Sequence, residues 1–384
     1  MKRILIVCNS LEFLVSHRFE FVKNISTISE TSILGGGHQS AQNKLGVLNV
    51  NISLSESASN RLSVVAAMFF FLQIKRNIKR SDADIIIPIG IKSCFFCSLF
   101  GFRAFGSKCI VPIFPGLGRI FSSNRFFIIR LASKFLFTLA MGNRNIYPIF
   151  QTFADYQSLF FFKARSRNKP LFVRGSGVNL KHYRNPSRLD IDDLRPIRVG
   201  FIGRLIEEKG ILDFLALSQM MHESQNPSFE FIYAGGFGLN SSKRVISRVN
   251  EAECQGYAKW LGFVEKPENF FSTIDILVYP ARYGDGIPKV LLEACAAGCY
   301  AIAYRSPGVE VAIAQYRTGF ILDEFTQEAL EREIKSFARL TKNERIRIAL
   351  NCAKRAEALF SETAVVSKLI RYIRKIDQVR RESC

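Results

Sequence analysis

Short apolar runs alternate with longer segments of helical spacing along most of this chain. The apolar runs span four to seven residues, which is typical of strands that are buried on both faces of a sheet. The segments between them repeat apolar residues at helical spacing and therefore predict helices. A chain that alternates strands and helices in this way predicts parallel sheets covered by helices on both faces.

This pattern runs through the chain twice, and a polar stretch at residues 185–196 separates the two passes. In the first pass we predict strands at 3–8, 31–35, 84–89, 108–114, 145–150 and 170–174, and helices at 16–29, 61–80, 92–102, 124–138 and 153–163. In the second we predict strands at 197–202, 229–234, 257–261, 275–279, 299–304 and 318–322, and helices at 209–223, 241–253, 267–273, 288–297 and 308–314. The last 55 residues predict helices only, at about 326–340, 343–359 and 361–380.

Two doubly wound α/β domains follow from this repeated architecture. We expect their bounds at residues 1–185 and 186–360, with residues 361–384 as a terminal helix. Ligands of such folds bind at the carboxyl ends of the strands. We therefore expect the active site at those ends, in a cleft that the two domains face.

The charge of the chain is strongly positive and unevenly spread. The chain has 384 residues, and its 53 Lys and Arg outnumber its 33 Asp and Glu, which gives a formal net charge of +20. Residues 1–174 hold 23 of the basic residues, only 7 of the acidic residues and 23 of the 35 Phe. This imbalance predicts an anionic partner for the first domain, such as nucleic acid, an anionic membrane or a phosphorylated ligand.

The cysteines and the amino terminus indicate a cytosolic protein. Several of the nine cysteines lie inside apolar runs, which favours buried, reduced thiols over disulfides. Cys94 and Cys97 have the spacing of a redox or zinc half-site, but no second pair follows, so we predict no metal there. The apolar run from Ile4 to Cys8 is too short for a signal peptide. No stretch reaches the roughly 18 apolar residues of a spanning helix.

A loop with the chemistry of a diphosphate site follows the first strand of the second domain. Residues 200–210 read Gly-Phe-Ile-Gly-Arg-Leu-Ile-Glu-Glu-Lys-Gly. Gly203 allows a tight turn, and Arg204 and Lys209 place two cations at the start of a helix, where backbone N–H groups already favour an anion. The alternative interpretation is a surface loop with ordinary charges.

A second glycine-rich loop, between a strand and a helix, carries two carboxylates. Asp285 and Glu293 lie eight residues apart, and Gly286 allows a ligand to approach the backbone closely. Pro288 suits the first turn of the helix. A carboxylate on that helix can accept hydrogen bonds from a sugar diol. Helix capping would explain Asp285 equally well, but it explains Glu293 poorly, because Glu293 lies in an apolar stretch.

These motifs together resemble the retaining glycosyltransferases of family 4, which have the GT-B fold. The segment 203–210 is similar to the donor-diphosphate motif of that family, and the pair Asp285 and Glu293 falls on its Glu-x7-Glu element. The resemblance is dense over residues 175–325 and sparse in the first domain. Further matching segments are Arg174-Gly-Ser-Gly-Val-Asn-Leu-Lys-His-Tyr183, Gly262-Phe-Val, Ser306-Pro-Gly-Val-Glu310 and Thr318-Gly-Phe-Ile.

The resemblance implies a role for each matching residue. Arg204 and Lys209 would hold the pyrophosphate of a nucleotide sugar and stabilise the charge on the leaving diphosphate. Glu293 would bind the ribose hydroxyls. Together with Asp285 these residues form the implied catalytic set. The other implied donor-binding residues are Gly203, Phe263, Val264, Gly286, Ile287 and Pro288.

One of these positions departs from the family pattern. Asp285 and the backbone of Gly286 and Ile287 would hold the transferred hexose, while Phe263 and Val264 would meet the base through backbone groups. The family usually has Glu where this chain has Asp285. Because Asp is one methylene shorter, we expect a looser contact with the sugar or a different preferred hexose.

The first domain offers two loops for the acceptor side. Ser16-His17-Arg18 is expected to open the first helix after a short loop, as in many relatives, although a capping or core role explains His17 as well. Pro115-Gly116-Leu117-Gly118-Arg119 follows a strand and resembles a Gly-Leu-Gly loop of relatives that extend lipid-linked sugars. Gly116 and Gly118 would turn backbone N–H groups toward an acceptor phosphate or the donor hexose. Arg119 adds a cation, for which a solvated surface charge is the alternative.

Two segments of the first domain combine basic and large apolar residues. Residues 61–80 and 119–134 suit the surface of an anionic leaflet, with sheet-covering helices as the alternative. Asp82-Ala-Asp84 spells a metal-binding motif of a different glycosyltransferase fold, but here it precedes a strand. We therefore interpret it as a solvated strand entry and expect an enzyme that needs neither a metal nor another cofactor.

The resemblance thus implies transfer of a hexose or N-acetylhexosamine, with retention, from a UDP-sugar to a polyprenyl-diphosphate-linked acceptor. Such reactions build surface polysaccharides such as O-antigen, capsule or exopolysaccharide. It also implies that the last helix crosses back onto the first domain, and that the enzyme lies on the inner face of the cytoplasmic membrane.

Two other hypotheses stay open at this point. A basic nucleic-acid-binding protein fits the charge and the many Phe residues, but it leaves both phosphate-loop motifs unexplained. A non-catalytic binder of sugar nucleotides would account for Asp285 as a decayed site.

Overall fold

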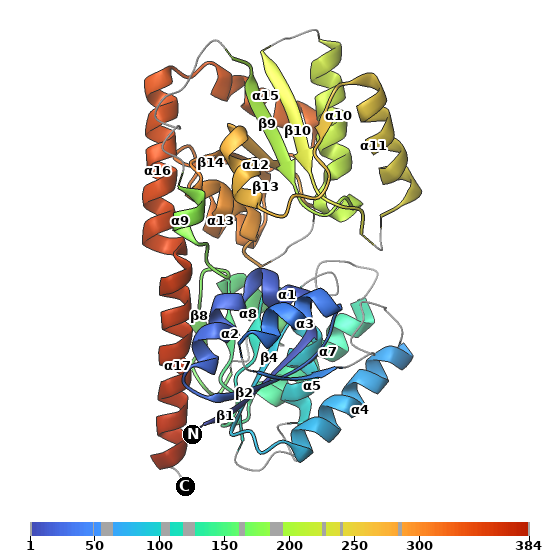
Figure 1. Ribbon diagram of the computed structural model, residues 1–384. Helices are drawn as coiled ribbons and strands as arrows, with labels where there is room; N and C mark the ends of the chain where they lie inside the picture. Colours follow the sequence, from blue (N-terminus) through green and yellow to red (C-terminus); the bar gives the residue numbers. More distant parts are fainter. Residues whose placement is uncertain are drawn as a thin grey trace. The chain divides into compact units, whose positions relative to one another are not determined.

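We describe the protein from a computed structural model (Figure 1). Its contacts divide the chain into two compact units, the first made of Met1–Ser176 with Glu362–Cys384 and the second of Gly177–Ser361. The structure describes residues 2–48, 50–54, 64–100, 108–117, 127–160, 166–184, 195–224, 228–238, 241–282 and 286–382.

The first unit is built on a parallel sheet with strand order β3-β2-β1-β4-β6-β7-β8, in which β5 also pairs with β4. Side chains of strand β1, in the interior of this sheet, alternate between two cores, as the pleat requires. Ile4, Ile6 and Cys8 enter one core, while Leu5 and Val7 enter the other. The strands are β1 (Arg3–Ser10), β2 (Glu30–Gly36), β3 (Asn51–Leu54), β4 (Ile85–Ile89), β5 (Cys109–Ile110), β6 (Ile113–Phe114), β7 (Ile149–Phe150) and β8 (Leu171–Phe172).

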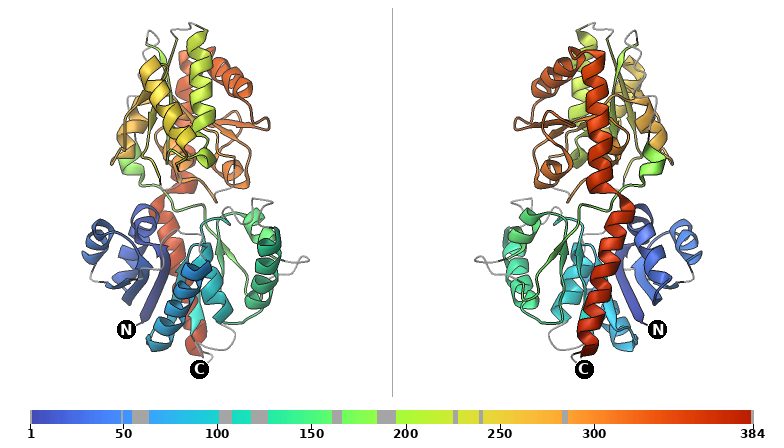
Figure 2. Two further views of the ribbon diagram at one scale, coloured as in Figure 1. Left: turned by 90° about the vertical axis from the view of Figure 1, so that its right-hand side faces the viewer. Right: turned by 90° about the vertical axis from the view of Figure 1, so that its left-hand side faces the viewer.

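Helices close both cores of this unit, one layer on each face of the sheet (Figures 1 and 2). Because both faces are covered, the interior strand β4 is apolar and buried along its whole length rather than alternating. One layer is α1 (Leu11–His17), α2 (Phe19–Ser26), α3 (Gln39–Gly46) and α17 (Glu362–Glu382). The other is α4 (Val64–Arg80), α5 (Ile91–Phe100), α7 (Phe127–Met141) and α8 (Phe153–Leu159).

The last helix, α17, belongs to the first unit although the chain reaches it from the second. Its apolar stripe, which includes Leu369 and Ile373, is buried in the core beside β1. Its far end is fixed by ion pairs, with Asp377 Oδ2 2.9 Å from Lys2 Nζ and Arg380 Nη2 2.8 Å from Asp84 Oδ1. The predicted return of this helix to the first domain is confirmed.

The second unit has a parallel sheet with strand order β11-β10-β9-β12-β13-β14. Its strands are β9 (Ile197–Ile202), β10 (Phe229–Ala234), β11 (Lys259–Trp260), β12 (Ile276–Tyr279), β13 (Tyr300–Tyr304) and β14 (Gly319–Leu322). Its helices are α9 (Leu180–Tyr183), η4 (Glu207–Lys209), α10 (Ile211–Glu223), α11 (Lys243–Gln255), α12 (Pro267–Thr273), α13 (Lys289–Ala296), α14 (Pro307–Ala312), α15 (Gln327–Ala338) and α16 (Lys342–Phe360). The predicted class, two doubly wound α/β domains, is confirmed.

The start of the first helix differs from the prediction. Ser10 caps α1 by accepting a hydrogen bond from the Phe13 N–H at 3.2 Å, so the helix begins at Leu11 instead of residue 16. His17 ends this helix, and Arg18 separates it from α2. The segment Ser16-His17-Arg18 therefore does not open the first helix, and that prediction is wrong.

The division between the units also differs from the predicted boundary near residue 185. Val178 donates its N–H to the Phe360 carbonyl at 2.8 Å, and the Tyr183 ring is buried in the core of the second unit. Because these contacts hold residues 177–183 to the second unit, the contacts divide the chain after Ser176.

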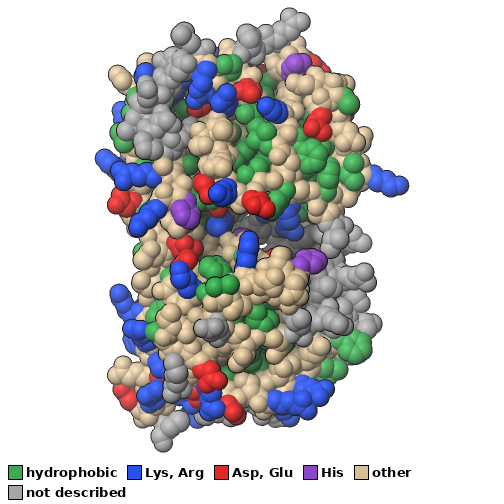
Figure 3. All heavy atoms as spheres, viewed as in Figure 1, with side chains coloured by type: hydrophobic (Ala, Val, Ile, Leu, Met, Phe, Trp, Pro, Cys, Tyr) green, Lys and Arg blue, Asp and Glu red, His purple; other side chains and the backbone are tan. Residues whose placement is uncertain are grey.

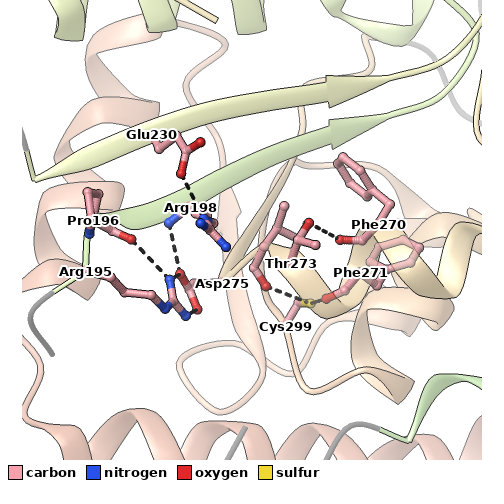
Figure 4. A network of polar contacts seen from close by, with 10 residues as sticks. Arg195, Pro196, Arg198, Glu230, Phe270, Phe271, Thr273, Asp275 and Cys299 are labelled. Carbon is pink, nitrogen blue, oxygen red and sulfur yellow. Dashed lines mark hydrogen bonds and ion pairs between the residues drawn. The ribbon is translucent and has the colours of Figure 1, made fainter. Parts of the chain in front are cut away.

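A polar network fixes the amino ends of β9 and β12 to each other (Figure 4). Arg195 makes two hydrogen bonds to the Asp275 carboxylate, both 2.8 Å long. The backbone N–H of Arg198 donates to the same carboxylate at 2.9 Å, and the Arg198 side chain pairs with Glu230 of β10. Asp275 thus holds the start of β12 against β9.

Replacement of Asp275 by Ala removes three hydrogen bonds to a charged acceptor. Asp275→Ala is expected to lower the free energy of unfolding by roughly 2–3 kcal/mol, because hydrogen bonds to charged groups contribute about 1.5–3 kcal/mol and several share this carboxylate. Urea denaturation measures this change. Glu324→Ala, which breaks the exposed ion pair with Arg332, is the control and is expected to cost less than about 1 kcal/mol. Equal losses in both variants would contradict the role of Asp275.

Candidate functional site

The strand order of the second sheet reverses between β9 and β12. β10 and β11 lie on one side of β9, whereas β12, β13 and β14 lie on the other. In open α/β sheets ligands bind outside the carboxyl ends of the strands at such a reversal, because the loops from the two neighbouring strands diverge there. The candidate site therefore lies at the carboxyl ends of β9 and β12.

The loop after β9 carries the two predicted cations. Arg204 is exposed, and its side chain makes no hydrogen bond or ion pair with the residues that the structure describes. Lys209 is the last residue of η4, and its Nζ lies 6.0 Å from the centre of the Tyr279 ring at the end of β12. The helix that we predict from residue 209 begins at Ile211, so both cations precede it, Arg204 in the loop and Lys209 at the end of η4.

Two other glycines, and not Gly203, make this loop possible. Gly210 has φ +82°, and a Cβ there would lie 2.1 Å from the Pro280 carbonyl oxygen. Gly235, after β10, has φ +146°, and a Cβ there would lie 1.8 Å from the Gly203 carbonyl oxygen. At Gly203 a Cβ would meet nothing closer than 3.7 Å, so the space around that turn does not itself require glycine.

An ion pair that the sequence analysis missed joins the loop after β12 to α10. Arg282 donates from Nε and Nη2 to the two oxygens of Asp213, each at 2.8 Å. Gln327 donates a third hydrogen bond to this buried carboxylate at 3.0 Å. The signal in the sequence is the single acidic residue inside the apolar run from Ile211 to Leu217. The pair fixes the path of the chain as it leaves β12.

The loop after β11 lies beside the loop after β10. Gly235 donates its N–H to the Gly262 carbonyl at 2.8 Å, and Trp260 donates from its ring to the Gly235 carbonyl at 3.0 Å. The next side chain, Phe263, is 76% exposed, and Val264 is partly buried. A large exposed ring at the carboxyl edge of a sheet is suited to contact a ligand.

Glu293 lies in the second turn of α13 and is only 7% exposed. The Tyr183 hydroxyl donates to Glu293 Oε1 at 2.8 Å, and Lys289 Nζ lies 3.4 Å from the same oxygen. Oε2 accepts no hydrogen bond from the described part of the chain. Tyr183 had no assigned role in the sequence analysis, because nothing in its neighbourhood points to a residue 110 positions away.

The surroundings of Glu293 hold its pKa above the ordinary value of 4.5. Burial is the largest cause, since it penalises the charged carboxylate, and the nearby Glu268 acts in the same direction. Lys289 and the Tyr183 hydroxyl oppose it by favouring the charged form. A buried carboxylate with a perturbed pKa next to a strand reversal is a typical feature of a functional site.

The remaining predicted donor-side residues lie just before α13. Gly286, Ile287 and Pro288 are buried, and Pro288 is the residue that caps the helix rather than part of its first turn. Asp285 lies outside the described residues, so the departure from the family pattern at this position stays a prediction.

The predicted acceptor-side residues are spread over two elements of the first unit. His17 stacks on Phe13 with ring centres 4.5 Å apart, and its Nδ1 lies 2.7 Å from the Ser16 hydroxyl. Gly116 follows β6 and has φ +138°, a conformation that favours glycine. Gly118 and Arg119 lie outside the described residues.

Asp82 and Asp84 are held by arginines of the first unit. Asp82 Oδ2 lies 3.1 Å from Arg3 Nη1, and the Arg3 backbone donates to Asp84 at 3.2 Å. Cys94 and Cys97 are buried in α5, and burial raises the pKa of both thiols. Within the described ranges, no three His, Cys, Asp or Glu side chains are arranged to hold a metal ion.

The second unit is similar to a known enzyme domain. Residues 191–355 match the family model of "Glycosyl transferases group 1". The matched segment contains Arg204, Lys209 and Glu293, but it begins after Tyr183. A curated protein of Klebsiella pneumoniae, "Uncharacterized 42.6 kDa protein in cps region", is 33% identical over 122 residues. This match covers 32% of the chain and 30% of that protein, so it spans less than a third of either.

Solved structures resemble the whole chain. Sucrose-phosphate synthase from Thermosynechococcus elongatus aligns with a TM-score of 0.76 and 14% identity, over 99% of this chain and all of that one. HepE of Anabaena in complex with UDP and glucose aligns with a TM-score of 0.75 and 14% identity, over 98% of this chain and 100% of that one. At these identities the likeness concerns the fold, and the predicted GT-B fold is confirmed.

The raised pKa of Glu293 predicts a specific dependence of stability on pH. The folded chain keeps this proton at pH values where the unfolded chain has released it, so the contribution is fully present below about pH 4.5 and is lost as pH rises through the folded pKa. The free energy of unfolding of the wild type, relative to Glu293→Gln, should therefore fall as pH increases. Urea denaturation at a series of pH values measures it.

The control for this experiment is an acidic residue with the opposite shift. Thr341 caps α16, and Glu344 completes the capping box by hydrogen bonds with Thr341 that lower the pKa of the Glu344 carboxyl. Relative to Glu344→Gln, wild-type stability should rise with pH. A constant difference between the wild type and Glu293→Gln across the series would contradict the raised pKa.

Proposed function

We propose that this protein is a retaining, metal-independent glycosyltransferase that moves a hexose or N-acetylhexosamine from a UDP-sugar to a lipid-held acceptor. The observation that carries the proposal is the placement of Arg204, Lys209 and Glu293. Arg204 and Lys209 follow β9, and Glu293 lies on α13, the helix that follows β12, all inside the segment that matches group 1 glycosyl transferases.

Arg204 and Lys209 are suited to hold the diphosphate of the donor. Both residues follow β9: Arg204 is exposed in the loop after that strand, and the Lys209 side chain reaches toward Tyr279 at the end of β12. When the bond between the sugar and the diphosphate breaks, negative charge grows on the departing phosphate oxygen. Two cations at this point would stabilise that charge and take the place of a divalent metal ion.

Glu293 is suited to bind the two ribose hydroxyls. Tyr183 and Lys289 contact Oε1, which leaves Oε2 as an acceptor for the diol. Phe263 would contact the nucleotide base. HepE was solved with UDP and glucose, which supports UDP as the nucleotide here. Asp285, with the backbone of Gly286 and Ile287, would hold the transferred sugar.

The acceptor is proposed to be a polyprenyl-diphosphate-linked sugar used for a surface polysaccharide. The Klebsiella relative is described as lying in a cps region, which supports this class of product. The excess of basic residues in the first unit suits a phosphorylated lipid, and the proposed location is the inner face of the cytoplasmic membrane. His17, Gly116, Gly118 and Arg119 are the proposed acceptor-side residues.

Removal of the exposed cation tests the donor site. Arg204→Ala should lower kcat by about 10–100-fold, because charge-assisted hydrogen bonds worth roughly 1.5–3 kcal/mol are lost from the transition state. Release of UDP from candidate UDP-sugars measures turnover, and EDTA should leave the wild-type rate unchanged. Arg339→Ala, at the end of α15, removes an exposed arginine far along the chain and is the control. Near-normal turnover of Arg204→Ala would overturn the assignment.

Tyr183 is expected to affect binding of the donor more than turnover. Tyr183→Phe removes the 2.8 Å hydrogen bond that orients Glu293 while keeping the ring. If Glu293 holds the ribose equally in the ground state and the transition state, KM for the donor should rise about 5–10-fold at unchanged kcat. Steady-state kinetics separate the two constants. A fall in kcat at constant KM would contradict the role of Glu293 in ribose binding.

A further inference from the structure

Three helices on one face of the first sheet contain no acidic residue. Within their bounds α4, α5 and α7 carry seven Lys and Arg and no Asp or Glu. On the opposite face α1, α2 and α17 each contain at least one acidic residue, whereas the short helix α3 contains none. A surface that needs only solubility normally mixes both signs. The fourth helix of this layer, α8, contains Asp155, so the charge bias belongs to α4, α5 and α7.

The side of α7 that faces away from the core carries apolar residues, where polar residues would be expected. Leu131, Phe135 and Leu139 follow each other at intervals of four and are 43%, 57% and 48% exposed. The inward side of the same helix is filled by other residues, among them Phe137 and Met141. Single exposed apolar residues are ordinary, but a stripe of three on one helix face marks an interaction surface.

Helix α4 repeats this arrangement and adds charge. Phe69 and Leu72 are about half exposed, whereas Phe70, Ile74 and Ile78 face the core. The outward positions that follow toward the end of the helix are exposed cations, and Figure 3 shows basic side chains gathered there beside hydrophobic ones. These cations are Lys75, Arg76, Lys79 and Arg80.

Helix α5 joins the two apolar surfaces into one layer. The Phe96 ring contacts the Phe71 ring of α4 with centres 5.2 Å apart, and the Phe95 ring contacts the Phe137 ring of α7 at 5.1 Å. Both α5 rings stay partly exposed. The left view of Figure 2 shows the three helices next to one another on the side turned to the viewer. Their outward faces therefore form one apolar and basic surface.

We infer that this surface, the outer face of α4, α5 and α7, docks on an anionic lipid bilayer. Apolar side chains enter the interfacial region while Lys and Arg bind the lipid phosphates, as in interfacial helices. A second copy of the chain is the weaker candidate, because a symmetric dimer would bring two faces of seven cations and no acid together. The inference deepens the proposed function and rests on it, since a lipid-held acceptor requires the enzyme at the bilayer.

No helix among the described residues is long and apolar enough to cross a membrane.

Co-sedimentation of the full chain with vesicles tests the inference. The protein should bind vesicles of equal parts phosphatidylcholine and phosphatidylglycerol, and it should not bind phosphatidylcholine alone. Arg76→Gln with Lys79→Gln should weaken binding by about fivefold for each cation removed. Phe135→Ser with Leu139→Ser should weaken vesicle binding by tenfold or more, because two apolar side chains that enter the bilayer are lost.

The opposite face of the same unit supplies matched controls. Arg374→Gln with Lys375→Gln removes two exposed cations from α17, and Val47→Ser removes an exposed apolar residue after α3. Both should bind vesicles within twofold of the wild type. If the α17 variant loses as much affinity as the α4 variant, the attraction is one of net charge and the proposed face is wrong.

Two further outcomes would overturn the inference. One is the absence of binding to any vesicle; the other is a dimer that sedimentation velocity detects and that Phe135→Ser with Leu139→Ser dissociates. UDP binding, measured by calorimetry on the same variants, keeps the two proposals apart. Loss of vesicle binding with UDP affinity intact concerns this surface, whereas a wild type that binds vesicles but not UDP would refute the donor site alone.

Discussion

Strand β9 is held between β10 and β12, and its pairing with β12 is the shorter of the two. Six residues of β9 pair with β10, but only two residues pair with β12, among them Gly200 opposite Leu277. Glycine is needed there because a Cβ on Gly200 would lie 2.6 Å from the Ile274 side chain. Asp275 adds hydrogen bonds to β9 at the amino ends. This junction fixes where the loops carrying Arg204 and the residues before α13 leave the sheet.

Glu293 is a buried acidic residue on α13, the helix that follows β12. A carboxylate buried in an apolar helix costs stability unless hydrogen bonds and a counter-charge compensate it. Tyr183 and Lys289 supply both, yet they leave the pKa raised. An apolar side chain of similar size would satisfy the core with less cost, so the position is better explained by ligand binding than by folding. Arg204 is likewise poorly explained by folding, because its exposed side chain makes no hydrogen bond or ion pair with the described residues.

The sequence predicts the fold well where periodicity is strong. The strands β1, β4, β9 and β10 and the helices α15 to α17 were expected within a few residues, because buried strands and amphipathic helices have distinct repeats. Helix α3 and strand β3 were missed, since both are short and α3 is largely polar. The start of α1 was missed because its cap, Ser10, follows the strand without a break.

The candidate site was predictable in part. Local motifs located Arg204, Lys209 and Glu293, because loop and helix spacing are visible along the chain. Contacts between distant segments were not, and Tyr183 with Glu293 and Arg282 with Asp213 are both of this kind. Gly235 was missed for the same reason, since its conformation depends on the neighbouring strand.

The central claim is that the carboxyl ends of β9 and β12 bind a nucleotide through its diphosphate. Calorimetric titration of the protein with UDP, UMP and uridine tests it most directly. If Arg204 and Lys209 hold the second phosphate, UDP should bind at least about tenfold more tightly than UMP, since one charge-assisted contact is worth roughly 1.5–3 kcal/mol. Equal affinity for UDP and UMP would contradict the account.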